Sequence, residues 1–110
     1  MKQVLLAPEA EQALLEIALY TLERWGEEQA RSYVQRIRDA CGRLADNPSL
    51  GRLRSRIRTT ELRECQVGSH IVIYAVRADD LLVVGVLHEA MNLDSRRRAL
   101  VMRMRQNGLL

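Results

Sequence analysis

The sequence has 110 residues, of which 47% are hydrophobic and 28% are charged, with a net charge of +3. This length and composition fit one soluble domain over residues 1–110 and exclude a largely disordered chain. The opening MKQVLLAP holds only four consecutive apolar residues, too few for a signal peptide or a membrane span, so we expect an intracellular, cytoplasmic protein with no membrane partner.

The first half of the chain is typical of one strand and two helices. Residues 4–7 resemble a short strand, and Pro8 suits the first turn of a helix that ends at Gly26. A second helix begins in EEQA and is terminated by DNPSLG. Because only about two residues join the helices, they form an antiparallel hairpin. We expect its core to include three aromatic residues: Tyr20, Trp25 and Tyr33.

Three strand-like segments follow, at residues 62–67, 70–76 and 81–88. In the segments 70–76 and 81–88, the residues that would point to either face of a strand are apolar. This pattern predicts central strands with helices on one face. Residues from Asp94 or Ser95 onward form a possible C-terminal helix. The predicted fold class is therefore α+β, in the order β-α-α-β-β-β, with the helical hairpin packed on a small, mostly antiparallel sheet.

The loop between the last two strands determines which residues face each other across them. A two-residue loop at Asp79-Asp80 would place Tyr74 opposite Gly85, with the ring covering the glycine. A three-residue loop would instead place His70 opposite His88. We favour the first arrangement.

Few residues suggest catalysis. The spacing of histidines and cysteines predicts no metal site and no cofactor, and Cys41 and Cys65 are read as small buried hydrophobic residues. Imidazole titrates near neutrality, so a histidine could transfer protons in RNA cleavage. A site of that kind would combine His70 with Tyr74 and Arg63.

Two cationic blocks interrupt a mildly acidic chain: residues 51–58 carry +4 and residues 96–110 carry +5. In the first block, GRLRSRIR, an arginine occupies every second position. If this segment is extended, all four guanidinium groups leave the same side of the chain. They could meet an acidic protein or nucleic acid, or they could form a solvated basic loop.

Several strings together resemble the ParE branch of the ParE/RelE toxin superfamily. They are RWGEEQARSYV (24–34, preceded by Tyr20), RLADNPSLGR (43–52), GSHIVIY (68–74) and VLHEAMNLDSR (87–97). The resemblance implies a small toxin held in a tight hetero-oligomeric complex by a ParD-like antitoxin. ParE members poison DNA gyrase, whereas RelE members cleave messenger RNA on the ribosome.

The RelE-type nucleases carry an arginine near the start of the third strand and an arginine and a tyrosine after the fourth. Here His70 occupies the first position, and no tyrosine follows Tyr74. The resemblance therefore favours a gyrase inhibitor that is not an enzyme. The alternatives are a RelE-like ribonuclease that uses His70, Tyr74 and Arg63, and a protein that binds its antitoxin but has lost its toxicity. Asn92 stands where ParE members often have aspartate, and Gly85 where a larger residue is usual.

The resemblance also assigns surfaces. An acidic, partly disordered antitoxin tail would lie along the helical hairpin and sheet on apolar anchors, with its carboxylates on the arginine row, Arg52, Arg54, Arg56 and Arg58. The gyrase-binding surface would follow the last strand, and its alternative is a solvated basic helix. The residues that we expect there are His88, Met91, Asn92, Arg96, Arg97 and Arg98.

Overall fold

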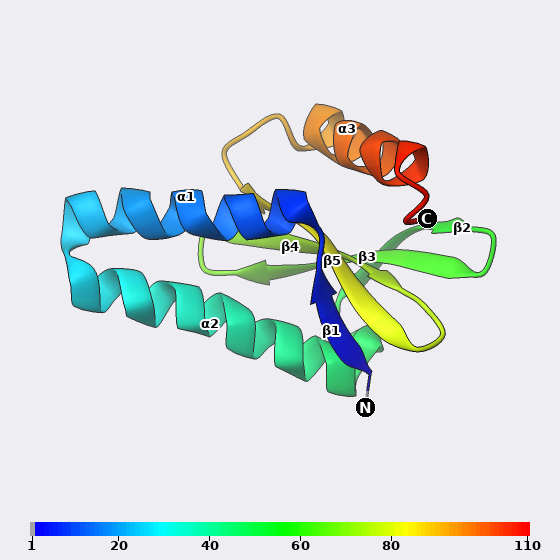
Figure 1. Cartoon of the computed structure of the whole chain (residues 1–110), viewed down its shortest axis with the longest axis horizontal. Helices are drawn as coiled ribbons and strands as arrows, with labels where there is room; N and C mark the ends of the chain where they lie inside the picture. Colours follow the sequence, from blue (N-terminus) through cyan, green and yellow to red (C-terminus); the bar gives the residue numbers. More distant parts are fainter. Residues whose placement is uncertain (1) are drawn as a thin grey trace.

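A computed structural model describes residues 2–110. Its elements are β1 (Gln3–Leu6), α1 (Pro8–Trp25), α2 (Glu27–Asp46), a 3-10 turn η1 (Pro48–Leu50), β2 (Arg52–Ile57), β3 (Thr60–Val67), β4 (His70–Val76), β5 (Asp80–His88) and α3 (Leu93–Gln106). The strands form one sheet in the order β1-β5-β4-β3-β2 (Figure 1). Only β1 runs parallel to its neighbour. The predicted α+β fold is confirmed, and β2 is a strand that the predicted element order omitted.

The helical hairpin forms as predicted. Pro8 occupies the first turn of α1, where its missing N–H leaves no helical bond unmade. Gly26 ends α1 and precedes α2 with a φ of 92°, a left-handed conformation that glycine adopts without strain. This single residue reverses the chain, so α1 and α2 lie antiparallel.

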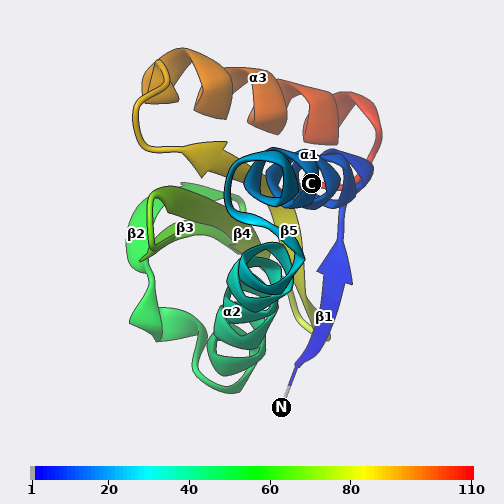
Figure 2. The same ribbon diagram turned by 90° about the vertical axis from the view of Figure 1, so that its left-hand side faces the viewer.

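The sheet is covered on both faces (Figure 2). The hairpin packs on one face, over a core that includes Leu14, Ile37 and Tyr74. α3 packs on the other face, over a second core that includes Ile73 and Met104. The predicted C-terminal helix is therefore confirmed, and it covers the side of the central strands that the hairpin leaves free.

The predicted pairing of Tyr74 with Gly85 is wrong. The backbone N–H of Arg77 donates to the Asp80 carbonyl, so the loop consists of residues 78–79, one position earlier than expected. An irregularity in β5 then shifts the register, and Tyr74 faces Val83 while His70 faces His88. Leu100 of α3, rather than a tyrosine ring, lies over Gly85.

The expectation for the hairpin aromatics is also wrong in part. Trp25 is 70% exposed and Tyr20 is 59% exposed, whereas Tyr33 is half-buried against the sheet. The tip of the hairpin, which includes Trp25, projects beyond the strands (Figure 1). No part of the sheet therefore covers the last turn of α1, and its aromatic side chains remain at the surface.

Candidate interaction sites

The arginine row does not leave one side of the chain, which corrects the prediction. Within β2 the partner of Leu53 is Arg63 and the partner of Ser55 is Leu62, so a bulge at position 54 breaks the alternation. Arg52 pairs with Glu64, and Arg56 pairs with Glu61 on the opposite face of β3. Arg58 has a φ of 57° in the turn after β2. All four arginines are exposed.

Carboxylates of β3 engage part of the row. Arg56 donates to Glu61 at 3.1 Å, and Arg54 lies 4.0 Å from Glu64. Hydrogen bonds from Arg63 and then Arg56 lower the pKa of Glu61, so it stays ionised. Within residues 2–110, Arg52 and Arg58 make no ion pair. These two guanidinium groups are the part of the row most available to another molecule.

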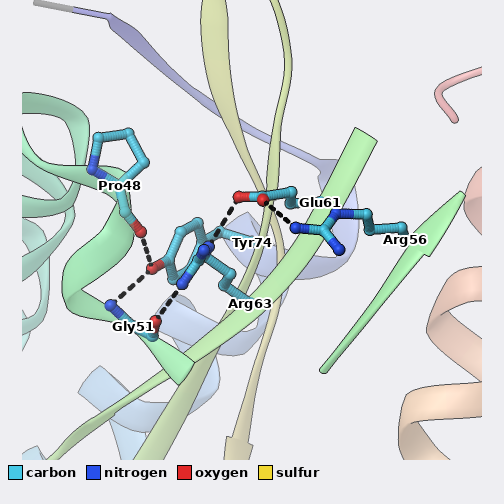
Figure 3. A network of polar contacts seen from close by, with 6 residues as sticks. All are labelled: Pro48, Gly51, Arg56, Glu61, Arg63 and Tyr74. Atoms are coloured by element: carbon cyan, nitrogen blue, oxygen red, sulfur yellow. Dashed lines mark hydrogen bonds and ion pairs between the residues drawn. The ribbon is translucent and has the colours of Figure 1, made fainter. Parts of the chain in front are cut away.

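Tyr74 and Arg63, two residues of the alternative nuclease site, hold the backbone between α2 and β2 (Figure 3). The Tyr74 hydroxyl donates to the Pro48 carbonyl at 2.6 Å and accepts from the Gly51 N–H at 3.0 Å. Arg63 donates to the Gly51 carbonyl at 2.7 Å and to Glu61 at 2.9 Å. Burial raises the pKa of Tyr74, whose side chain is fully enclosed. This pair serves as a structural clamp on Gly51.

The third nuclease candidate, His70, belongs to a separate cluster. Its Nδ1 lies 2.6 Å from the Tyr33 hydroxyl, and its ring meets His88 edge-on at a centroid distance of 5.1 Å. Residues four apart on a strand are separated by about 13 Å, so His70 and Tyr74 do not share a site. Burial, and then the neighbouring His88, lower the pKa of His70. His70 is therefore neutral at pH 7.

A groove of about 640 Å³ opens beside this histidine cluster, between the hairpin and the ends of β4 and β5. Trp25 and Tyr20 line it together with Met91, which is 40% exposed. Exposed aromatic residues and methionine around a groove are typical of protein-binding surfaces. Sequence periodicity missed Tyr20 and Trp25 as surface residues, because their helical spacing continues the apolar stripe of α1.

The pH dependence of stability tests the state of His70. Because its pKa is lowered in the folded chain, the unfolded chain takes up a proton first as the pH falls through 6.5. The free energy of unfolding should therefore decrease on acidification below that pH and be fully retained above it. His70→Asn should show a shallower decrease in denaturant titrations between pH 8 and 5. If the free energy of unfolding changed equally with pH in both proteins, the lowered pKa of His70 in the folded chain would be contradicted.

The predicted target surface divides into parts with different environments. His88 and Met91 line the groove beside Trp25. The side chain of Asn92 caps α3 by accepting from the Ser95 N–H at 3.3 Å. Arg97 forms a bidentate ion pair with Glu64, in which Nη2 lies 2.8 Å from Oε1.

Arg96 and Arg98 are exposed on the same helix. The structure thus gives Asn92 and Arg97 structural contacts and leaves the other members of the predicted surface accessible.

Residues 2–110 contain no group of three or more histidine, cysteine or acidic residues that could hold a metal ion. Nor does any helix in that range have the length and apolarity to cross a membrane. Burial raises the pKa of Cys41 to about 11, which makes its thiol unreactive at neutral pH.

Comparison with known proteins places these features in a family. Residues 4–93 match the model of the ParE toxin of the type II toxin–antitoxin system parDE. Toxin ParE1 of Mycobacterium tuberculosis is 40% identical over 91 residues, covering 82% of this chain and 92% of the relative. Toxin ParE1 of Caulobacter vibrioides is 34% identical, covering 84% and 94%. Toxin ParE of Escherichia coli is 34% identical, covering 87% and 93%.

A solved structure, described as the chromosomal ParDE toxin–antitoxin system from P. aeruginosa, shares the fold. Its TM-score is 0.67 at 18% sequence identity, and the superposition covers 80% of this chain and 96% of that one. The family match includes the arginine row and the histidine cluster and ends before most of α3. The chain belongs to the ParE toxin family of type II toxin–antitoxin systems.

Proposed function

We propose that this ParE-family toxin acts in the cytoplasm by binding and inhibiting DNA gyrase, without a cofactor. The observation that carries the proposal is the family match over residues 4–93. The environment of the candidate nuclease residues supports it, because Tyr74 is enclosed and both Tyr74 and Arg63 hold the Gly51 segment. What remains exposed is a set of apolar and cationic surfaces suited to binding macromolecules.

A ParD-like antitoxin would bind the outer face of the hairpin. Leu15, Leu19 and Leu22 of α1 are 53%, 56% and 45% exposed, and their spacing places them on one side of the helix. Ala18 of α1 adjoins these leucines, and Val34 continues the apolar surface into α2. An amphipathic segment of the antitoxin would cover it, because a groove between two helices accepts the apolar face of a third.

The arginine row would capture the acidic part of the same antitoxin. Exposed ion pairs add about 0–1 kcal/mol each and act mainly on association rate. Replacing all four arginines of the row by glutamine should therefore slow association with purified antitoxin and flatten its salt dependence, as measured by stopped-flow fluorescence. The control removes the same charge elsewhere, by glutamine at Arg36, Arg43, Arg96 and Arg103. An unchanged association rate in the row variant would refute this role.

Purified gyrase provides the test of the target. The protein is added to gyrase with ATP and relaxed plasmid, and the plasmid is then resolved on a gel. We expect loss of supercoiling, with cleaved plasmid released when gyrase is digested by protease. Full supercoiling at a large excess of folded toxin would reject gyrase as the target.

The alternative function, a RelE-like ribosome-dependent ribonuclease, is favoured by one observation. The Tyr33 hydroxyl and two imidazoles gather beside an open groove, and such groups can transfer protons. Adding the protein to translating ribosomes tests this directly. Cleavage of the message at codon boundaries, lost in His70→Asn, would support the alternative, and intact message would remove it.

A further inference from the structure

A second groove, of about 450 Å³, lies on the sheet face opposite the hairpin, between α3 and the β2–β3 strands. α3 packs over β5, where Leu100 lies against the Gly85 backbone. The outer strands on this face are less covered, and the exposed strand β2 forms the edge of the sheet. Figure 2 shows α3 on the side of the sheet away from the hairpin.

The fold brings the two cationic blocks of the sequence together at this groove. Arg54 comes from the first block, and Arg97, Arg98 and Arg105 come from the second. Arg97 is neutralised by Glu64, whereas Arg54 lies 4.0 Å from the same carboxylate. Arg98 and Arg105 are exposed and have no ion pair within residues 2–110. Arg98 and Arg105 therefore give the rim two guanidinium groups that no described carboxylate neutralises.

The floor of the groove is apolar. Leu62 and Ile73 form part of it, and both are almost fully buried. Val101 is half-buried beside them, and Met102, which is 61% exposed, stands at the rim. A ligand that fills this groove must bring apolar groups to the floor and negative charge to the rim.

We infer that this groove binds an acidic amphipathic segment of the protein antitoxin. The inference rests on the proposed neutralisation by an antitoxin and adds a second docking site, on the other face of the sheet. Carboxylates of the segment would pair with Arg54, Arg98 and Arg105, while its apolar side chains would cover Val101 and Met102. A segment that also reaches the hairpin would pass around the exposed β2 edge.

The lining favours such a peptide over nucleic acid. No aromatic side chain lines the groove, so bases would find nothing to stack on. A phosphate chain also has no apolar groups for the floor. Most of the cationic rim is on α3, beyond the family-matched residues 4–93, so this groove depends on the part of the chain outside that match.

The test uses the full chain and a fluorescein-labelled 16-residue peptide that carries leucine on one helical face and glutamate elsewhere. Binding is followed by fluorescence anisotropy at low and moderate salt. We expect saturable binding that weakens about tenfold in Arg98→Gln/Arg105→Gln, because two charge-assisted contacts are lost. Met102→Ser should also weaken binding, while Arg36→Gln/Arg43→Gln, with the same loss of charge on α2, should not.

Two outcomes would overturn the inference. One is equal weakening in the α2 control, which would mean that the peptide only senses net charge. The other is tight binding of a labelled 20-base-pair DNA duplex through Arg98 and Arg105 with no binding of the peptide, which would make the groove a phosphate site. Gyrase inhibition is measured without the peptide. Failure of the gyrase assay would therefore not change the interpretation of the peptide-binding assay.

Discussion

The Gly51→Ala variant should lose about 3 kcal/mol or more of its free energy of unfolding. A Cβ at this position would lie 2.0 Å from the Tyr74 hydroxyl oxygen and 2.8 Å from the Glu64 carbonyl oxygen. The hydroxyl cannot move aside freely, because it donates to Pro48 and accepts from the Gly51 N–H. The substitution therefore either breaks the clamp or displaces the buried backbone of β3.

Urea denaturation measures this effect, and Gly42→Ala is the matched control. Gly42 lies within α2 with nothing within 4 Å of the position that a Cβ would take. Alanine should therefore stabilise the chain there by about 0.5–1 kcal/mol, through its higher helix propensity. Equal stability of Gly51→Ala and the parent would show that the clamp is not rigid.

Met104→Ala should cost about 3 kcal/mol, because it removes a fully buried side chain from the core under α3. A short helix of 14 residues such as α3 is marginal alone, so its order depends on this packing. The melting temperature, followed by circular dichroism, should fall by about 10–20 °C.

The control for that variant is on the same helix. Met102 is 61% exposed, and Met102→Ala should change the free energy of unfolding by less than about 0.5 kcal/mol. If Met104→Ala and Met102→Ala both had the melting temperature of the parent, α3 would contribute nothing to the stability of the sheet.

Much of the fold could be predicted because its signals are local. Pro8 and Gly26 delimit α1, and the β-branched runs of β4 and β5 mark central strands. Strand β2 was harder to recognise, since five of its six residues are exposed and three are arginine. Its pairing with β3 comes from tertiary contacts such as Arg56 with Glu61. The register was predicted wrongly for a different reason: the irregularity in β5 lies beside Gly85, and an isolated glycine in a strand is a bulge signal that the prediction did not use.

The candidate sites depended even more on tertiary structure. The alternation of residues 52–58 predicted that all four arginines leave the same side of the chain. A single bulged position, Arg54, breaks that alternation. His70, Tyr74 and Arg63 lie close enough in sequence to suggest one site, yet the Tyr74 hydroxyl bonds to the η1 segment while His70 meets Tyr33. The exposure of Trp25 follows from how far the hairpin extends beyond the sheet, which no local pattern encodes.

We propose above all that this toxin arrests growth by binding gyrase on its DNA rather than by cleaving messenger RNA. The most direct measurement is made in cells that express the chain and are lysed rapidly with detergent and protease. We expect the recovered plasmid to carry double-strand breaks that appear only after gyrase is digested, and the cellular messenger RNA to be of full length. Intact, normally supercoiled plasmid together with fragmented messages would contradict this proposal.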